Sequence, residues 1–384
     1  MARPRFHRVR VESVTPVAAD GSAVEVTCLV PDELTGAFAF TPGQHVTVRL
    51  PVDGRQIRRS YSLCSTPREL VGRGRLRLGV RVVPGGAFST YAAGELAAGD
   101  QLELLSPVGT FGVRFDPARR RHYAAVAAGS GITPVLSLVA TALETEPGSR
   151  FTVLYGNRAA GSAMFTDELG DLKDRHPRRL HLVHLFSREQ PRVGLPRGRL
   201  DRDTLEGLFA RLLPPAEVDE WFVCGPAGMV DGTRAALAGH GVDPAAVHTE
   251  LFHPGEPARE SRTAPAAGAA SGADAVDAVD AVDAVDAVDA VDASEVSVVM
   301  DGRVTSVPLE PGRTVLDAVM AARPDVPYSC QTGVCGTCRA RVVEGRVRMA
   351  RTWALSEQDR TAGDILTCQA VPLTARVRID FDVL

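Results

Sequence analysis

CQTGVCGTC, residues 330–338, places three of the chain's seven cysteines within nine positions, in the pattern C-x4-C-x2-C. A fourth cysteine, Cys368, follows further along the chain. Such a group can bind a metal cluster, bind zinc or form disulfides. The start of the chain, MARPRFHRVR, is charged and lacks the apolar stretch of a secretory signal, so we expect a cytoplasmic protein. In a reducing compartment, clustered cysteines favour metal binding over disulfides.

The spacing of these cysteines distinguishes between the metals. C-x4-C-x2-C with a distant fourth cysteine is typical of plant-type [2Fe–2S] clusters, so Cys330, Cys335, Cys338 and Cys368 are the predicted iron ligands. Small residues in YSCQTGVCGTC let backbone N–H groups approach the cluster sulfurs. A four-cysteine zinc site is the alternative, although such sites typically show paired C-x2-C knuckles.

The overall composition limits the class of protein. The 384 residues include 43 basic and 47 acidic ones, a net charge of −4, which gives no reason to expect a nucleic-acid partner. The most apolar window, residues 123–143, is interrupted by Gly129, Gly131 and Pro134, which favours a buried strand, loop and helix over a membrane span. We therefore expect a soluble multidomain protein with neither a nucleic-acid nor a membrane partner.

Residues 255–294 differ in composition from the rest of the chain. They contain the run DAVDAVDAVDAVDAVDAVDA, whose period of three fits neither a helix nor a strand. The seven aspartates from Asp274 to Asp292 repel one another, which favours an extended tether. An acidic docking strip for a basic partner is the alternative interpretation.

Two further domains are predicted before this linker. Short alternating strands such as VEVTCLV and RLRLGVRVV, within residues 1–114, indicate an antiparallel β-barrel. In residues 115–254, apolar strands such as FTVLYG alternate with helical stretches, which indicates a doubly wound α/β domain with a parallel sheet. The region after the linker, 295–384, contains a hairpin, a helix, the cysteine loop and further strands.

Three motifs of the α/β region each follow a predicted strand. AAGSGITP, residues 127–134, places Gly129 and Gly131 between a strand and a helix, where backbone N–H groups can bind phosphate. Taken alone, glycines in such a turn are commonly structural. LYGNR at 154–158 and CGPAGM at 224–229 strengthen the prediction, because all three would lie at the carboxyl edge of the sheet, where ligands bind.

Two motifs of the barrel region suggest a second binding site. In RRSYSL, residues 58–63, strand alternation places Arg59 and Tyr61 on one face and Ser60 and Ser62 on the other. An exposed arginine beside a core tyrosine would explain this motif taken alone. PGGAFST, residues 84–90, supplies glycine backbone and a hydroxyl as a second anion contact.

Together these motifs resemble the ferredoxin-NADP reductase superfamily, from the first strand to about residue 253. The resemblance implies that Arg59 contacts a flavin phosphate, Tyr61 packs on the isoalloxazine and Ser62 lies near N5, with Gly86 and Ser89 at the flavin phosphates. It assigns the nicotinamide nucleotide to a set comprising Gly129, Gly131, Thr133, Pro134, Cys224, Gly225 and Pro226. Tyr61, Ser62 and Cys224 are the implied catalytic residues. Phe88 replaces a cysteine of the plant reductases, and Phe252 is a candidate flavin neighbour.

Nucleotide preference depends on whether the 2′-phosphate of NADPH is bound. FSREQ, residues 186–190, resembles the serine-arginine pair of NADPH-using members, so Ser187 and Arg188 are predicted to bind this phosphate, assisted by Arg158. An ordinary surface arginine is the alternative. FAD in place of FMN is implied by the resemblance alone.

Residues 295–384 are similar to a plant-type ferredoxin domain, which implies an α+β β-grasp fold. A nicotinamide gives up two electrons together and a [2Fe–2S] cluster takes one, so a flavin between them explains the three sites. The order of domains resembles the reductase components of multicomponent oxygenases. RSYSLCSTP, VPGGAFSTY and SPVGTFG are most similar to the reductase subunits of 1,2-phenylacetyl-CoA epoxidases, which act in phenylacetate catabolism, and 3-ketosteroid 9α-hydroxylase reductases share the layout.

A separate oxygenase is the implied partner, because the chain lacks the residues of a di-iron site. Such a site uses two E-x-x-H helices and two further glutamates, and the chain has one E-x-x-H, Glu250 to His253. Two other classes of protein each explain half of the sequence. A nitric oxide dioxygenase would share the first two domains but carry a globin, and an iron–sulfur carrier would leave the nucleotide motifs unexplained.

Overall fold

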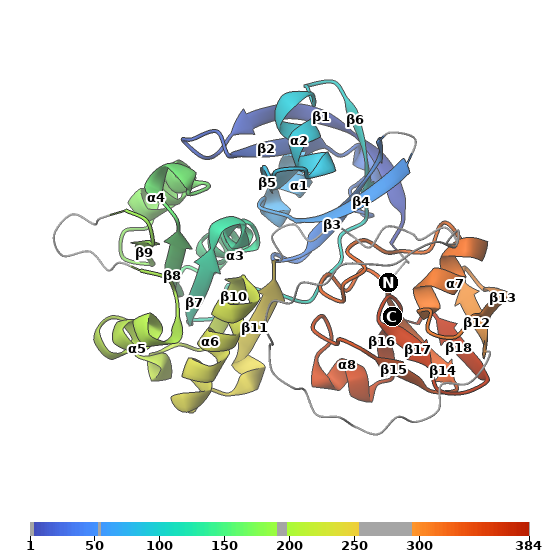
Figure 1. The fold of residues 1–384 in the computed structure, drawn as a ribbon. Coiled ribbons are helices and arrows are strands. Elements are labelled where there is room, and N and C mark those ends of the chain that lie inside the picture. Colours follow the sequence, from blue (N-terminus) through green and yellow to red (C-terminus); the bar gives the residue numbers. More distant parts are fainter. Residues whose placement is uncertain (1–3, 53–54, 190–197, 253–293, 384) are drawn as a thin grey trace, which may run out of the picture. The chain divides into compact units, whose positions relative to one another are not determined.

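The computed structural model describes residues 4–52, 55–189, 198–252 and 294–383 (Figure 1). The chain divides into two compact units. One comprises residues 1–256 with 327–338, and the other comprises 257–326 with 339–384. The predicted linker, residues 255–294, lies outside the described residues except for Ser294.

The N-terminal strands form an antiparallel sheet in the order β4-β3-β6-β1-β2-β5. A bridge between Leu63 and Leu78 joins its two edges, so the sheet closes into a barrel around an apolar core. The barrel's elements are β1 (Phe6–Pro16), β2 (Ala23–Leu29), the 3₁₀ turn η1 (Asp32–Leu34), β3 (His45–Val52), β4 (Arg55–Ser62), α1 (Pro67–Arg73), β5 (Arg75–Arg81), α2 (Ala87–Gly94) and β6 (Gln101–Leu105).

The second sheet of this unit is parallel, with strand order β11-β10-β7-β8-β9. Because β7 is the first of these strands in the chain, the order reverses between β7 and β10, and ligands bind at such a switch point. The elements are β7 (His122–Ala128), η2 (Gly129–Gly131), α3 (Ile132–Thr145), β8 (Arg150–Asn157), η3 (Ala160–Ser162), α4 (Thr166–Arg175), β9 (Leu180–Phe186), α5 (Arg202–Arg211), η4 (Pro215–Glu217), β10 (Glu220–Gly225), α6 (Ala227–Gly239), η5 (Pro244–Ala246) and β11 (Val247–Leu251).

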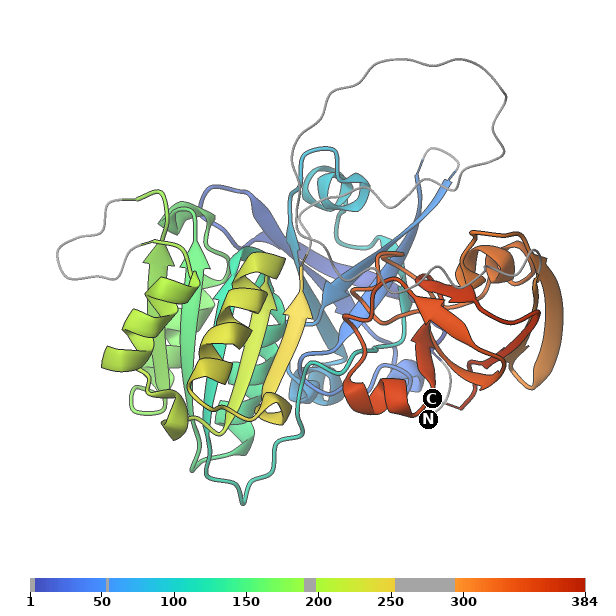
Figure 2. The ribbon, with the colours of Figure 1, turned by 60° about the horizontal axis from the view of Figure 1, so that its bottom comes forward.

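Helices cover both faces of the parallel sheet. Figure 2 shows helices on each side of the sheet. Tyr123 and Ala125 of β7 pack into a core with α3 and α4, whereas Ala124 and Val126 pack into a core with α5 and α6. Residues of β7 are almost all buried because both faces are covered. This explains the unbroken apolar run of that strand.

The second unit contains a mixed sheet in the order β13-β12-β18-β14-β16. Strands β12 and β13 form a hairpin, β18 pairs with β12 in parallel, and α7 packs on β12 and β13. The elements are β12 (Ser294–Met300), β13 (Arg303–Leu309), α7 (Val315–Ala322), β14 (Arg339–Glu344), β15 (Val347–Met349), α8 (Glu357–Thr361), β16 (Asp364–Leu366), β17 (Ala370–Pro372) and β18 (Arg376–Asp380). Strands β15 and β17 pair separately.

The predicted fold class is confirmed: an antiparallel flavin-type barrel, a doubly wound α/β domain and a ferredoxin-type domain. Two local features differ from expectation. Helix α1 is not among the predicted elements, although Thr66, Pro67 and Glu69 form a local start signal with a capping box. The predicted glycine loop at Gly129 and Gly131 is a 3₁₀ turn that leads directly into α3.

Candidate active site

The glycine turn after β7 lies against the end of β10. A Cβ atom on Gly131 would come within 2.2 Å of the Cys224 carbonyl oxygen, so only glycine allows this approach. Gly129 has a φ of +55°, which a residue without a Cβ adopts readily. The two predicted nucleotide motifs therefore meet at the switch point of the sheet.

Helices at these motifs begin without a side-chain cap. No side chain caps α2, α3 or α6, which start after Gly86, Gly131 and Pro226. By contrast, α1, α5, α7 and α8 are capped by Thr66, Asp201, Thr314 and Ser356, while α4 is also uncapped. Uncapped N–H groups at a helix start can bind phosphate oxygens, so these helix starts suit the predicted ligands.

Other residues of the nucleotide set support the two turns. Thr133 donates through its hydroxyl to the Ser130 carbonyl (3.0 Å), and Pro134 is buried in the first turn of α3. Gly225 lies close to Met229, and its carbonyl accepts from the Phe252 backbone N–H (2.9 Å). Phe252 thus lies at the same edge of the sheet, partly buried.

Strand β4 presents different side chains to its two faces. The Tyr61 ring packs against Phe88, with ring centroids 5.1 Å apart, and burial raises the pKa of Tyr61. Arg59 on the same face donates to the Arg58 carbonyl (2.8 Å). On the other face, Ser60 and Thr47 hydroxyls lie 3.4 Å apart. The alternation expected from the sequence is present.

Gly86 and Ser89 form the start of α2. The Ser89 hydroxyl accepts from the Val83 backbone N–H (3.1 Å) and donates to the Gly86 carbonyl (3.2 Å). A Cβ on Gly86 would lie 2.5 Å from the Ser89 oxygen, so glycine is needed for this closed turn. Ser89 therefore shapes the helix start that the sequence assigned to flavin phosphate.

A partly buried acid, Glu250, joins the barrel to the parallel sheet. The Ser62 hydroxyl donates to Glu250 Oε2 (3.3 Å), and the Cys224 thiol lies 3.9 Å from the same oxygen. Burial raises the pKa of Glu250 to about 7, and burial followed by the nearby Glu250 raises the pKa of Cys224 well above its ordinary value. Two of the three predicted catalytic residues, Ser62 and Cys224, are brought together here.

The basic side chain of His45 lies beside this acid, but it does not form an ion pair with it at neutral pH. Its Nδ1 lies 3.9 Å from Glu250 Oε1 and has no hydrogen-bond partner among the described residues. Burial lowers the pKa of His45 to about 4, so the imidazole is neutral. Within the described ranges Glu250 is therefore an acid without a charged partner, and such groups are common in active sites.

Sequence reasoning missed Glu250 and His45. The E-x-x-H pattern drew attention to Glu250 only as a metal motif, and His253 lies outside the described residues. The useful signal was position: in the parallel register Glu250 pairs with Cys224, at the carboxyl end of a strand. For His45 there was no comparable signal.

The residues predicted to select NADPH lie at the ends of two adjacent strands. Ser187 and Arg188 follow β9, Arg158 follows β8, and all three side chains are exposed. Backbone hydrogen bonds join the two segments, since Ser187 N–H donates to the Asn157 carbonyl (3.0 Å) and Arg188 N–H to the Arg158 carbonyl (2.9 Å). The neighbouring Glu189 carboxylate accepts from the Ala160 backbone N–H (2.9 Å).

The cysteine loop directs backbone N–H groups at a sulfur. Cys330 Sγ accepts from the N–H groups of Thr332 (3.5 Å) and Cys335 (3.4 Å). Hydrogen bonding from the Cys335 side chain lowers the pKa of Cys330 to about 5 against the opposing effect of burial, and the Thr332 side chain and these backbone groups add to the lowering. Positive φ angles at Gln331, Gly333 and Gly336 turn the chain tightly. A stabilised thiolate in such a loop fits a soft iron ligand.

Cys368, the fourth predicted ligand, follows β16 in the second unit and is buried. The Gln369 amide donates to its sulfur (3.6 Å). In the described part of the chain, no three side chains of the metal-binding types surround one ion position. A [2Fe–2S] cluster does not require this, because its four cysteines are shared between two irons.

The sites and the fold together define a class: an oxidoreductase with flavin, nicotinamide-nucleotide and iron–sulfur domains. Three family models match the chain. They are an oxidoreductase FAD-binding domain at residues 10–112, an oxidoreductase NAD-binding domain at 125–235 and a 2Fe-2S iron-sulfur cluster binding domain at 298–373.

The chain belongs to the reductase components of multicomponent oxygenases. It is 38% identical to a subunit of the 1,2-phenylacetyl-CoA epoxidase of Escherichia coli K12, over 98% of each chain. It is 35% identical to the ferredoxin reductase component of the 3-ketosteroid-9-alpha-monooxygenase of Rhodococcus rhodochrous, over 97% of this chain and 95% of the relative.

A solved structure shares the fold. Phthalate dioxygenase reductase matches over 98% of each chain with a TM-score of 0.54 and 22% identity, a likeness that concerns the fold alone. Each helix in the described residues is too short or too polar to cross a bilayer.

Proposed function

We propose that this reductase passes electrons from NADPH through FAD and a [2Fe–2S] cluster to a separate di-iron oxygenase that epoxidises phenylacetyl-CoA. The observation that carries the proposal is the 38% identity, over almost the whole of both chains, to a component of such an epoxidase. The reducing cytoplasm suits a cluster bound by four cysteines, so we propose that the protein works there.

The chain's own residues fit the flavin. In the proposal Arg59 and the start of α2 at Gly86 and Ser89 bind its phosphates, while Tyr61 packs on the isoalloxazine. When bound, the flavin accepts a hydride and releases electrons one at a time. Domain limits of 1–114, 115–254 and 295–384, with a tether at 255–294, follow from the positions of these motifs.

The nicotinamide end of the nucleotide is proposed to lie at Cys224, beside Ser62 and Glu250. Gly129, Gly131, Thr133 and Pro134 hold the pyrophosphate, Gly225 and Pro226 complete the edge, and Phe252 is the proposed flavin neighbour. Ser62, from the barrel, and Cys224, from the nucleotide domain, both approach the carboxyl group of Glu250. The group can hold a proton there at neutral pH, since burial raises the pKa of Glu250 to about 7.

The cluster ligands in the proposal are Cys330, Cys335, Cys338 and Cys368. Substitution of Cys335 by serine should abolish the iron–sulfur absorption and the transfer of electrons to the oxygenase, with NADPH-dependent reduction of ferricyanide by the flavin retained. Substitution of the buried barrel cysteine Cys28 by serine is the control, because that thiol lies outside the motif. Equal iron content in the C335S variant would refute the ligand assignment.

NADPH preference is assigned to Arg188, with Ser187 and Arg158. An Arg188→Ala variant should bind NADPH about tenfold more weakly, the loss of one charge-assisted hydrogen bond, and bind NADH as before. Arg211→Ala, at the exposed end of α5, is the matched control. Anaerobic titration of the flavin absorption with each nucleotide measures both affinities. An NADH preference in the unmodified protein would contradict the assignment.

The oxygenase partner is tested by reconstitution. The purified reductase is mixed with the oxygenase components of an Escherichia coli phenylacetyl-CoA epoxidase, or with the oxygenase component of a 3-ketosteroid monooxygenase. Epoxide formation coupled to NADPH oxidation in the first mixture is the expected result. Coupled turnover in the second mixture alone would identify the alternative, a ketosteroid-type reductase.

A further inference from the structure

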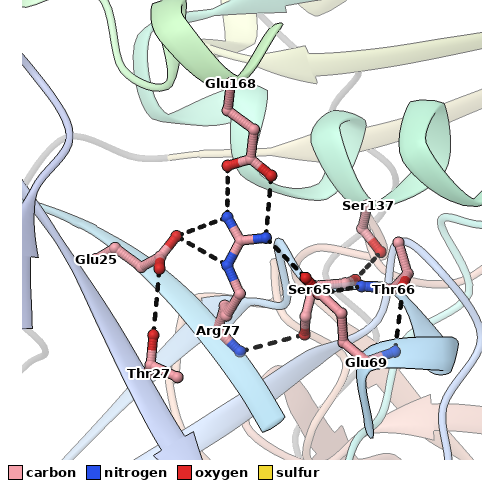
Figure 3. A network of polar contacts seen from close by, with 8 residues as sticks. All are labelled: Glu25, Thr27, Ser65, Thr66, Glu69, Arg77, Ser137 and Glu168. Carbon is pink, nitrogen blue, oxygen red and sulfur yellow. Dashed lines mark hydrogen bonds and ion pairs between the residues drawn. The ribbon is translucent and has the colours of Figure 1, made fainter. Parts of the chain in front are cut away.

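A single arginine on β5 is surrounded by three carboxylates (Figure 3). Arg77 Nε and Nη2 donate to Glu25 (3.0 and 2.8 Å), and Nη1 donates to Glu69 (3.2 Å). Nη1 also donates to one oxygen of Glu168 (3.0 Å), and Nη2 donates to the other. All five N–H groups of the guanidinium are thereby used, in a side chain that is 14% exposed.

The three acids come from both domains of the larger unit. Glu25 on β2 and Glu69 on α1 belong to the barrel, whereas Glu168 lies on α4 of the nucleotide domain. Thr27 donates to Glu25 (3.2 Å), and Glu69 caps α1 by accepting from the Thr66 backbone N–H (2.9 Å). Glu25 and Glu69 are thus held in place within the barrel, and they in turn hold Arg77. The ion pair between Arg77 and Glu168 therefore ties the position of α4 to that of the barrel.

Contacts beside Arg77 reach the proposed nucleotide site. Two residues further along β5, a Cβ atom on Gly79 would lie 2.5 Å from the Thr133 methyl group, so this strand touches the GSGITP segment. The Ser137 hydroxyl on α3 donates to the Ser65 carbonyl (2.7 Å), and the Arg77 backbone N–H donates to the Ser65 hydroxyl (3.1 Å).

The segment from Ser62 to Ser65 also contributes to the proposed hydride site. Ser62, which donates to Glu250, precedes Ser65 by three positions, while Cys224 and Glu250 belong to the nucleotide domain. A rotation of one domain against the other would therefore change the distance from Ser62 to Glu250. Hydride transfer is sensitive to such changes, since a displacement of about 1 Å can cost roughly 100-fold in rate.

We propose that Arg77 is a positioning residue for hydride transfer: through Glu168 it holds the nucleotide domain against the flavin barrel. The inference rests on the proposed hydride site at Ser62, Cys224 and Glu250. Arg77 is assigned no contact with nucleotide or flavin and acts through the relative position of the two domains.

Glu168→Gln tests the proposal with little risk to folding. Arg77 keeps Glu25 and Glu69, so the barrel retains its ion pairs, whereas the charged link across the junction is lost. Arg75→Met is the matched control, because Arg75 lies on the same strand and pairs within the barrel with Glu12 (2.6 Å). A conservative Arg77→Lys variant retains the charge without the planar fork of donors.

Two measurements distinguish positioning from general stabilisation. Stopped-flow reduction of the flavin at saturating NADPH should be on the order of 10-fold slower in Glu168→Gln, with an intermediate rate in Arg77→Lys and an unchanged rate in Arg75→Met. NADPH affinity and flavin content should stay unchanged. Hydrogen exchange of the protein without nucleotide should quicken at residues 65–69 and 132–137 only.

Each other outcome overturns the inference. An unchanged limiting rate in Glu168→Gln, together with a lower melting temperature, would mean that Arg77 stabilises the fold and does not position the domains for hydride transfer. An equal loss of the limiting rate in Arg75→Met would show that the ion pair across the domain junction has no special role. An unmodified protein whose flavin is reduced by neither NADPH nor NADH would refute the proposed function, and the inference with it.

Discussion

Two partly buried polar clusters, centred on Glu250 and on Arg77, differ in how their charged groups are paired. Glu250 has Ser62 and Cys224 as neighbours and a neutral imidazole 3.9 Å away, so burial raises its pKa to about 7. Arg77 is surrounded by three carboxylates and uses every donor. The paired charge suits a joint between domains, whereas the unpaired acid can change its protonation state at neutral pH.

Removal of the central cation should cause the largest loss of stability. Arg77→Met leaves three partly buried carboxylates uncompensated, which should cost about 3 kcal/mol. Melting followed by circular dichroism should then show Tm lower by roughly 5–10 °C. Arg75→Met breaks a more exposed pair and should change stability by less than about 1 kcal/mol. Equal shifts in the two variants would erase the contrast between the clusters.

Neutralisation of the unpaired acid should stabilise the protein, and only at higher pH. A carboxyl group whose pKa rises on folding from 4.5 to about 7 keeps its proton more tightly in the folded state. Its contribution therefore destabilises the fold progressively as pH rises from 4.5 to 7, and is constant above that. Glu250→Gln should match the unmodified protein near pH 4.5 and be up to ~3 kcal/mol more stable above pH 7.

Melting curves of the two proteins across this pH range test the prediction. A pH-independent difference would mean that Glu250 already ionises at its ordinary pKa. The clusters around Glu250 and Arg77 would then differ in geometry but not in how folding changes the pKa of their acids.

A smaller effect should follow from loss of the Ser62 hydroxyl. Its hydrogen bond favours the charged form of Glu250, so Ser62→Ala should raise the pKa of Glu250 further, by about one unit or less. The carboxyl band in infrared difference spectra, assigned with Glu250→Gln, measures this pKa. Ser60→Ala, on the same face of β4, is the control and should leave it unchanged. A lowered pKa in Ser62→Ala would reverse the assigned role of the bond.

Local patterns predicted the fold class and the strand that carries Arg59, Tyr61 and Ser62. Period-two alternation assigned the two faces of β4, and the glycine motifs indicated the carboxyl edge of the parallel sheet. The cysteine spacing predicted the cofactor of the last domain, which the 2Fe-2S family model matches. The ligand set itself, with Cys368, stays a prediction.

The two polar clusters could not be predicted because their members are distant in sequence. Ser62 and Glu250 are 188 positions apart, and Arg77 and Glu168 are 91 apart. In a strand such as RLRLGVR, an arginine at an alternate position is normally taken as solvent-facing, since nothing local indicates that α4 will cover it. Only the packing of two domains makes Arg77 a largely covered residue, with 14% of its side chain exposed.

The close approach of Gly131 to the Cys224 carbonyl limits how this protein can be re-engineered. Any side chain at position 131 would displace the backbone of the turn that carries the cysteine, so libraries that vary this turn would yield few working variants. Arg158, Ser187 and Arg188 lie exposed at other strand ends, where replacement is tolerated by the packing. Under the proposed assignment, a variant that uses a different nucleotide should therefore be sought at these three exposed residues, with the turn at Gly131 left unchanged.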